Sequence, residues 1–184
     1  MLMRWFLAVS IAALAMAQEL GLPHGAVTRL TSPDGAYTLY GVVDSEPQLW
    51  IENTRTQFRR KLLDVPGTLS ARWSPDSRAF TVSYGPSDSK QAYIYDAGTL
   101  ERLDVGSRIL EADASARRFS GGHAYFVPES WEDAQHVIVR FNGHTDESPV
   151  VCFDFRYRVS RAGVVERLSQ RSGPFGTCGF GAPQ

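Results

Sequence analysis

Hydrophobic and polar residues alternate over short segments along most of the chain after residue 17, and Gly, Pro, Asp, Asn and Ser separate these segments. The segments are rich in Val, Ile, Tyr, Phe, Trp and Thr, which favour strands. Little of this part of the chain shows the 3.6-residue period of an amphipathic helix. The pattern predicts an all-β protein with hairpin connections. The expected strands are 26–31, 37–43, 48–53, 59–65, 68–73, 79–84, 91–96, 100–105, 108–112, 123–127, 136–141, 150–159 and 164–168.

The clearest alternation lies in the segment CFDFRYRV, residues 152–159. Successive side chains of a strand point to opposite faces of its sheet. The aromatic side chains therefore share one face, and the charged side chains share the other. We predict that the aromatic face joins the core. Its residues are Phe153, Phe155 and Tyr157.

Parts of the pattern return at a spacing near 42 residues. TSPDGAYT (31–38) and WSPDSRAF (73–80) share a Ser-Pro-Asp unit 42 residues apart, and QLWIEN (48–53) matches QAYIYD (91–96) 43 residues later. A third copy is weaker: WEDA (131–134) precedes a strand much as WSPD does, and VERL (165–168) echoes LERL (100–103). Repeats of about 40–45 residues with four short strands each are typical of propeller blades.

The Ser-Pro-Asp units, followed by a strand and then by LWI or YIY, resemble the propeller repeats of TolB and of the prolyl-oligopeptidase N-terminal domain. In that family the motif lies at the turn between the first two strands of a blade. The resemblance covers residues 26–105 well and 125–168 loosely. It implies propeller-like, antiparallel four-stranded blade units. Because closed propellers usually have about 4–8 blades and this chain supplies about three, we expect an incomplete or open ring.

Three arrangements of the repeats remain open: an open stack, a pair of copies, or a degenerate relative of a longer propeller. The expected units are 26–67, 68–106 and 123–170 within a domain of 18–170. Residues 107–122 are an insertion, forming either an edge strand with a loop or a short helix across one face. Residues 171–184 are expected to form a Gly-rich C-terminal tail.

The first 17 residues have the pattern of a signal peptide. Arg4 precedes an apolar run of 13 residues that ends with the small-x-small sequence Ala15-Met16-Ala17. The run is shorter than the about 20 residues that a spanning helix needs. An uncleaved N-terminal anchor is the alternative. The pattern predicts a secreted or periplasmic protein with no stable membrane span after cleavage.

Charge and cysteine content narrow the function further. Without residues 1–17 the chain has 18 basic residues (19 less Arg4) and 20 acidic ones. Nucleic-acid binders carry a stronger basic bias, so we expect no nucleic-acid partner. Cys152 and Cys178, the only cysteines, could form one disulfide in an oxidising compartment, and two unpaired thiols are the alternative. They lack the further ligands of a zinc site, and we expect no cofactor and no metal.

The Ser-Pro-Asp units themselves are expected to be structural turns. Proline suits the second position of a turn, and the following Asp accepts hydrogen bonds from nearby backbone N–H groups. Gly35 can adopt a positive φ without steric cost, whereas Ser77 replaces it in the second copy, which we expect to differ slightly or to be strained. The turn residues are Ser32, Pro33, Asp34 and Gly35 in the first copy and Ser74, Pro75 and Asp76 in the second.

No catalytic motif stands out. The chain has no Gly-x-Ser-x-Gly elbow, no HExxH pair, no phosphate-binding loop and no calcium loop. His144 lies in a polar turn with Asp146 and Glu147 and could bind a metal, but a solvated hairpin tip is favoured. We therefore predict that the protein is not an enzyme.

The best candidate surface lies in VPESWEDAQ, residues 127–135, where acids flank a tryptophan. Such a combination could bind a carbohydrate or a cation, and a degenerate blade turn is the alternative. The candidate binding residues are Glu129, Trp131, Glu132, Asp133 and His144.

The sequence thus favours a secreted or periplasmic, non-enzymatic propeller-like module that binds a protein or a peptide. One alternative is an enzyme or enzyme accessory that acts on an extracellular polymer, and it requires the loops 128–135 and 142–147 to converge. Another is a degenerate propeller that works by self-association, as a homodimer.

Overall fold

The computed structural model describes residues 18–22, 28–42 and 47–178. The predicted signal peptide (1–17), the start of the first expected strand (26–27) and the last six residues of the expected tail lie outside the described residues.

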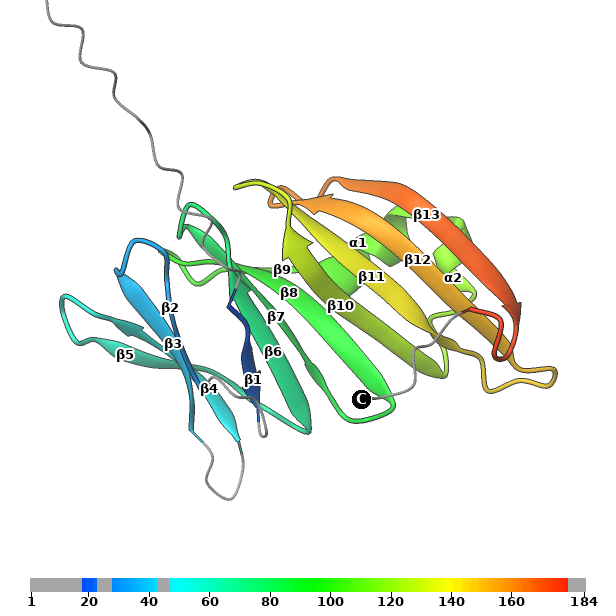
Figure 1. The fold of residues 1–184 in the computed structure, drawn as a ribbon, viewed down its shortest axis with the longest axis horizontal. Helices are drawn as coiled ribbons and strands as arrows, with labels where there is room; N and C mark the ends of the chain where they lie inside the picture. The colour runs from blue at the N-terminus through cyan, green and yellow to red at the C-terminus, as the bar shows by residue number, and fades with distance from the viewer. Residues whose placement is uncertain (1–17, 23–27, 43–46, 179–184) are drawn as a thin grey trace, which may run out of the picture.

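The first sheet is an antiparallel four-stranded meander (Figure 1). It consists of β2 (Arg29–Thr31), β3 (Tyr37–Val42), β4 (Gln48–Asn53) and β5 (Arg59–Asp64). One face of this sheet is apolar and buried, because alternate residues of each strand are leucine or isoleucine. These buried residues are Leu30, Leu39, Leu49, Ile51 and Leu63.

A second meander packs against the first. It consists of β6 (Thr68–Trp73), β7 (Ala79–Gly85), β8 (Ser89–Asp96) and the short β9 (Arg102–Asp104), and β1 (Leu20–Leu22) pairs with the free side of β6. Apolar side chains of both sheets form one hydrophobic cluster that includes Leu39, Trp73 and Phe80. The two repeats that the sequence matches best are therefore two neighbouring sheets with a shared core.

The third meander extends the second sheet instead of standing as a separate blade. It consists of β10 (His123–Trp131), β11 (His136–His144), β12 (Val151–Ser160) and β13 (Val165–Pro174). β10 pairs in parallel with β8 through Ala124 opposite Ser89 and Tyr125 opposite Lys90. This pairing is available because β9 covers only residues 93–95 of β8. The result is a continuous nine-stranded sheet within the described part of the chain.

The segment between the second and third meanders is helical. The strand predicted for residues 108–112 is wrong, because α1 (Val105–Ala112) occupies them and α2 (Ala114–Arg117) follows. Asp104 caps α1 by accepting a hydrogen bond from the Ser107 backbone N–H. Neither helix is both long and apolar enough to cross a membrane.

The two helices cover one face of the third meander (Figure 1). Ile109 and Phe119, both buried, belong to the same hydrophobic cluster as the aromatic face of β12. The prediction that this face joins the core is confirmed, since Phe153, Phe155 and Tyr157 are fully buried. Residues 107–122 thus cover the apolar face of the third meander, which would otherwise be exposed to water.

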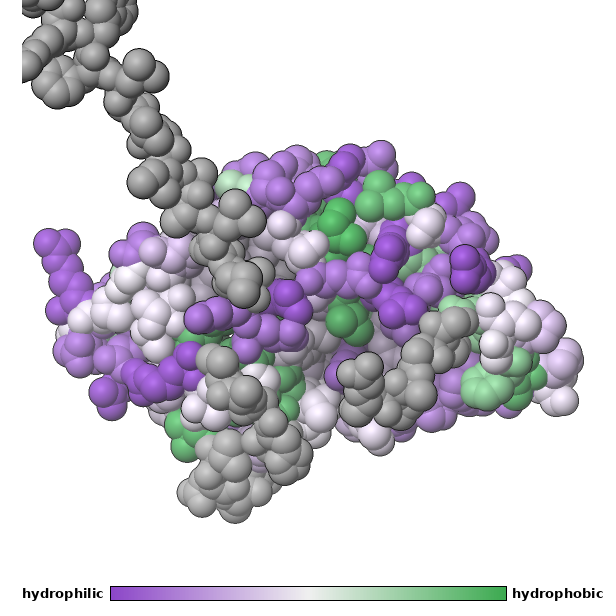
Figure 2. Space-filling model, viewed as in Figure 1, coloured by the Kyte–Doolittle hydropathy of each residue, from purple (hydrophilic) through white to green (hydrophobic). Residues whose placement is uncertain are grey.

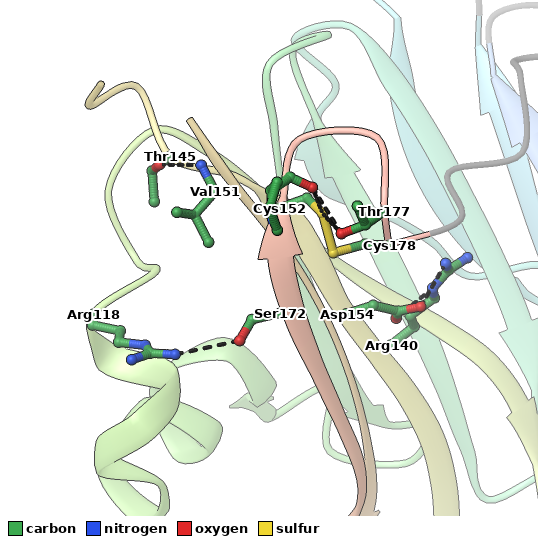
Figure 3. Close-up of a disulfide and its surroundings, with 10 residues drawn as sticks. Arg118, Arg140, Thr145, Val151, Cys152, Asp154, Ser172, Thr177 and Cys178 are labelled. Carbon is green, nitrogen blue, oxygen red and sulfur yellow. Dashed lines mark hydrogen bonds and ion pairs between the residues drawn. A yellow bond between two sulfur atoms is a disulfide. The ribbon is translucent and has the colours of Figure 1, made fainter. Parts of the chain in front are cut away.

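The C-terminal tail begins later than expected. Residues 171–174 belong to β13 and pair with β12, from Asp154 opposite Arg171 to Val151 opposite Pro174. The polar and Gly-containing sequence did not indicate a strand there, because the pairing is imposed by the neighbouring strand. Beyond β13, Cys178 forms a disulfide with Cys152, with a Cα–Cα distance of 5.9 Å (Figure 3).

The predicted fold class is confirmed. The described residues form propeller-like sheets that are antiparallel except for the pairing of β10 with β8, and these sheets close no ring.

Candidate interaction surface

The first Ser-Pro-Asp turn connects β2 and β3 through a local network. The Ser32 hydroxyl donates to Asp34 Oδ1 at 2.6 Å, and the backbone N–H of Ala36 donates to the same oxygen at 3.0 Å. Gly35 has φ 75°, and its N–H donates to Ser32 O. The Ser32 hydroxyl, and then the Ala36 N–H, hold the pKa of Asp34 below its usual value.

The second turn repeats this network between β6 and β7. Ser74 Oγ donates to Asp76 Oδ1 at 2.7 Å, and Arg78 N donates to the same atom at 3.1 Å. Ser77 takes the place of Gly35 with φ 62°, a conformation that is costly for a residue with a side chain. Its hydroxyl accepts a hydrogen bond from Asp34 N at 2.9 Å. This bond joins the two turns and compensates for part of that cost.

Asp76 also fastens the third meander to the second. Arg161, between β12 and β13, places Nη1 3.3 Å from Asp76 Oδ2 and Nη2 3.2 Å from Asp96 Oδ2. Burial by itself raises the pKa of Asp76, but the hydrogen bonds from Ser74 and Arg78 and the charge of Arg161 lower it below its usual value. Sequence reasoning missed this contact because it joins residues 85 positions apart. Both aspartates of the repeat therefore have structural partners.

The acidic residues of the candidate surface are also engaged within the protein. Glu129 pairs with Arg156 at 3.2 Å, and Glu132 accepts two hydrogen bonds from Arg158, at 2.6 and 2.8 Å. The hydrogen bond from Arg158 is the largest cause that holds the pKa of Glu132 below its usual value. These pairs lie on the solvent-facing side of the strands, where ion pairs contribute little to stability. A cation would have to compete with these arginines.

Asp133 and Trp131, at the end of the β10–β11 hairpin where β10 ends and β11 begins, also have partners within the protein. Asp133 accepts hydrogen bonds from the backbone N–H groups of Gln135 and His136 and lies 2.9 Å from His136 Nδ1. Trp131 is half-buried, packs against the core and donates from Nε1 to Arg72 O at 3.4 Å. The tryptophan therefore has contacts within the protein through both its ring and its Nε1 group.

His144 lies at the other end of the same hairpin. In the pairing of β10 with β11, His144 is opposite His123, whereas Trp131 is opposite Val137. Strands advance about 3.4 Å per residue, so these ends are roughly 25 Å apart. The five candidate residues do not form one surface. The structure places residues 128–135 and 142–147 at opposite ends of the β10–β11 hairpin. The two loops therefore do not converge, although the hypothesis of an enzyme acting on a polymer requires it.

The face of the third meander opposite the helices is a mixed polar surface. Figure 2 shows hydrophilic and hydrophobic side chains interspersed over it. Arg140 makes a two-pronged contact with Asp154 across β11 and β12, at 2.8 and 2.9 Å (Figure 3). The charged side chains on this face are largely paired with one another. The face therefore has little net charge to attract a charged ligand.

The outer side of β13 is the most accessible part of the third meander. β13 is the last strand of its sheet, and seven consecutive residues, 166–172, are exposed. Its pairing with β12 shifts register between Arg167 and Ser169, which marks a bulge at Leu168. Residues 169–174 pair regularly beyond the bulge. We call their outer side the open edge.

The direction of the backbone groups at the open edge follows from one hydrogen bond. The N–H of Phe175 points back to Val150 O, at 3.2 Å. N–H and C=O groups alternate in direction along a strand. The N–H and C=O groups of Gln170 and Ser172 therefore point away from β12. Within the described chain no strand pairs with them.

Comparisons with known proteins place this fold. No protein-family description and no curated protein sequence matches the chain. Among solved structures, it is similar to the β-propeller domain of the Trilobed protease from Pyrococcus furiosus, an open velcro topology, with 15% identity, TM-score 0.51, and coverage of 78% of this chain and 43% of that one. It is also similar to TolB from Acinetobacter baumannii, with 18% identity, a TM-score of 0.44, and coverage of 77% of this chain and 32% of that one. A third similar structure is acylaminoacyl peptidase from Pyrococcus horikoshii, with 15% identity, a TM-score of 0.45, and coverage of 78% of this chain and 24% of that one.

The fold and the comparison with the Pyrococcus furiosus domain define this chain as a propeller-type β protein with an open arrangement of sheets. The predicted resemblance to propeller repeats is confirmed at the level of the fold. The chain spans less than half the length of each of these structures.

Proposed function

We propose that this chain is a non-enzymatic module, secreted or periplasmic, that binds a protein or peptide partner by adding a partner strand to the open edge. The observation that carries the proposal is the row of outward backbone groups on a regular, exposed strand segment. Such an edge is a template for a further strand, and peptide-recognition domains use edges of this kind.

The chemistry of the edge indicates the kind of segment it would accept. Arg171 is exposed and has no ion-pair partner within the described residues, whereas Glu166 and Arg167 are paired with Arg158 and Asp113. An extended segment that places an acidic side chain near Arg171 would gain a charge-assisted contact. The bulge at Leu168 interrupts the edge on one side and so limits the length of the added strand.

Two further features support an extracytoplasmic location. Arg4 and the apolar run that ends at Ala17 have the pattern of a secretory signal. The disulfide between Cys152 and Cys178 suits an oxidising compartment. The internal partners of the Ser-Pro-Asp turns and of the acidic residues at 129–133 favour a structural role for these groups over a catalytic one.

A matched pair of variants at one position tests the proposal. Gln170→Pro removes an outward N–H without removing a bond to β12, because proline is tolerated at an edge position that faces solvent. Gln170→Ala keeps that N–H. Random peptides displayed on phage are selected on the wild-type protein without residues 1–17. We expect enriched peptides to bind the alanine variant as they bind wild type and to bind the proline variant at least about tenfold more weakly, the loss of at least one hydrogen bond.

Phe58→Lys serves as a control for surface changes elsewhere, since Phe58 is 65% exposed and lies before β5 of the first sheet. Peptides that bind all variants equally would show that the open edge is not the site. A dimer that the proline variant dissociates, with no peptide enriched, would replace the peptide partner with a second copy of this chain.

A further inference from the structure

Three potential metal ligands meet at the end of the hairpin where β10 begins and β11 ends. His123 is the first residue of β10 and is directly opposite His144, the last residue of β11. Their rings stack with centroids 4.2 Å apart. Asp146 follows in the loop towards β12, with Oδ1 3.8 Å from His123 Nε2. One ligand atom from each of the three residues lies within 4.8 Å of the other two.

The hydrogen bonds around the two rings determine which nitrogen is free. His144 Nδ1 is 3.2 Å from the carbonyl oxygen of Thr145. A carbonyl only accepts, so in the neutral imidazole Nδ1 carries the proton and Nε2 carries the lone pair. His123 Nδ1 is 3.4 Å from the Tyr125 hydroxyl, which uses its own proton in a 2.8 Å bond to Ser87 O. That hydroxyl therefore accepts from His123 Nδ1, and in the neutral form of His123 the lone pair is on Nε2.

The hydrogen bonds of the two Nδ1 atoms resemble those made by the second ring nitrogen of metal-bound histidines. Such histidines usually donate the proton of the second ring nitrogen to a carbonyl or another acceptor, which orients the ring. Phe175 adds a further constraint, because its ring meets His144 edge-on at 5.2 Å. Both imidazoles are thus oriented by groups outside the cluster.

The backbone beside the cluster is shaped to let these groups approach. Gly122 has φ 81°, and a Cβ at this position would lie 3.0 Å from Asp146 Oδ2 and 3.1 Å from His144 O. A Cβ at Gly143 would lie only 1.7 Å from His123 O. A larger residue at either position would push the ligands apart.

We propose that His123, His144 and Asp146 form a binding site for a divalent transition-metal ion, and that Zn²⁺ is the ion it fits best. Two imidazole nitrogens and one carboxylate oxygen are a donor set that suits zinc, whereas calcium and magnesium prefer oxygen ligands alone. Zinc holds its ligands at about 2.0–2.1 Å, so ligand atoms around it are about 3.3 Å apart. Small side-chain movements would bring the three ligand atoms, which lie within 4.8 Å of one another, to this spacing. Three protein ligands leave one position for water or for a group from another molecule.

Sequence reasoning considered His144 with Asp146 and Glu147 and favoured a solvated turn. It did not include His123, which is 21 residues away from His144. Strand pairing brings the two histidines together. The site is independent of the open edge, so its test does not depend on the proposed function.

Titration calorimetry with Zn²⁺ alone, on the chain from residue 18 onwards, tests the site. We expect one ion per chain, and His123→Gln and His144→Gln should each weaken binding at least about tenfold. His136→Gln is the matched control, because His136 also contacts an aspartate, at 2.9 Å, but lies at the opposite end of the hairpin. It should leave zinc binding unchanged.

Two further measurements keep the test decisive if a histidine variant folds poorly. Asp146→Asn changes a side chain that is 65% exposed, and it should also weaken binding. Co²⁺ bound at the site should give the visible absorption of a four-coordinate ion, which His144→Gln abolishes. The proposal is overturned if the wild type binds no zinc up to roughly 100 µM, if His136→Gln loses as much affinity as His144→Gln, or if Ca²⁺ binds equally well.

Discussion

Asp113 joins the helical cover to the third meander, and its removal should be costly. Asp113 is the N-cap of α2 and accepts a hydrogen bond from the Ser115 backbone N–H at 2.9 Å. It also accepts hydrogen bonds from the Tyr157 hydroxyl and from Arg167 Nη1, both at 2.9 Å. Its side chain is 12% exposed, and Tyr157 is fully buried. The Asp113 carboxylate thus accepts hydrogen bonds from α2, from the buried Tyr157 hydroxyl and from Arg167 of β13.

The expected cost of Asp113→Ala follows from these contacts. Loss of an N-cap lowers the free energy of unfolding by about 1 kcal/mol. Leaving the buried Tyr157 hydroxyl without an acceptor adds about 1–3 kcal/mol. We expect a total loss of about 3 kcal/mol at pH 7. Tyr157→Phe should cost only about 1 kcal/mol, because the carboxylate keeps its hydrogen bonds from Ser115 and Arg167.

The same carboxylate predicts a dependence on pH. Burial by itself raises the pKa of Asp113, but hydrogen bonds from Ser115 and Tyr157 and the charge of Arg167 lower it to about 2, from 3.8. Because the folded pKa is below the unfolded pKa, the stabilisation is fully present above about pH 4 and is lost as the pH falls towards 2. The difference corresponds to about 2 kcal/mol.

Urea unfolding followed by tryptophan fluorescence, at pH 7, 5, 3.5 and 2.5, measures both effects. The gap in unfolding free energy between wild type and Asp113→Ala should be largest at pH 7 and should narrow below pH 4. A cost below about 1 kcal/mol at pH 7, or a gap that stays constant down to pH 2.5, would refute the role assigned to this carboxylate.

Two further predictions concern the repeat turns and the disulfide. Asp34→Ala should lower the unfolding free energy by about 1 kcal/mol for lost turn hydrogen bonds. Asp76→Ala should lower it by more, because Arg161, whose side chain is 18% exposed, also loses a partner. Partner binding should persist in the folded fraction, and equal losses at both positions in urea titrations would show that the Arg161 contact contributes nothing. Replacing Cys152 and Cys178 with alanine should cost about 3 kcal/mol in the same assay, since the bridge spans 26 residues; a loss below 1 kcal/mol would contradict this estimate.

Local features were sufficient for much of the fold. The strand pattern and the two Ser-Pro-Asp turns are short-range properties, since proline, aspartate and a residue with positive φ complete the turn within five or six positions. The aromatic face of β12 could be identified for the same reason, because alternation alone decides which side chains share a face. For residues 107–122 the sequence left an edge strand with a loop and a short helix both open, and the packing of Ile109 and Phe119 against the third meander decides for the helix.

The candidate site depends on contacts that no local pattern contains. Glu129 and Glu132 look like free acids in the sequence, and arginines of β12 pair with them in the structure. His123 becomes a neighbour of His144 only through the register of β10 and β11.

The sequence by itself determined most of the strands, the repeat turns and the buried face of β12, because these depend on residues within a few positions of one another. Only the tertiary structure decided that the third meander continues the second sheet, that β13 presents an open edge, and that two histidines and an aspartate meet. The physical reason is that sheet order and register are set by pairing between distant segments, and a slip of one residue would turn each side chain to the other face.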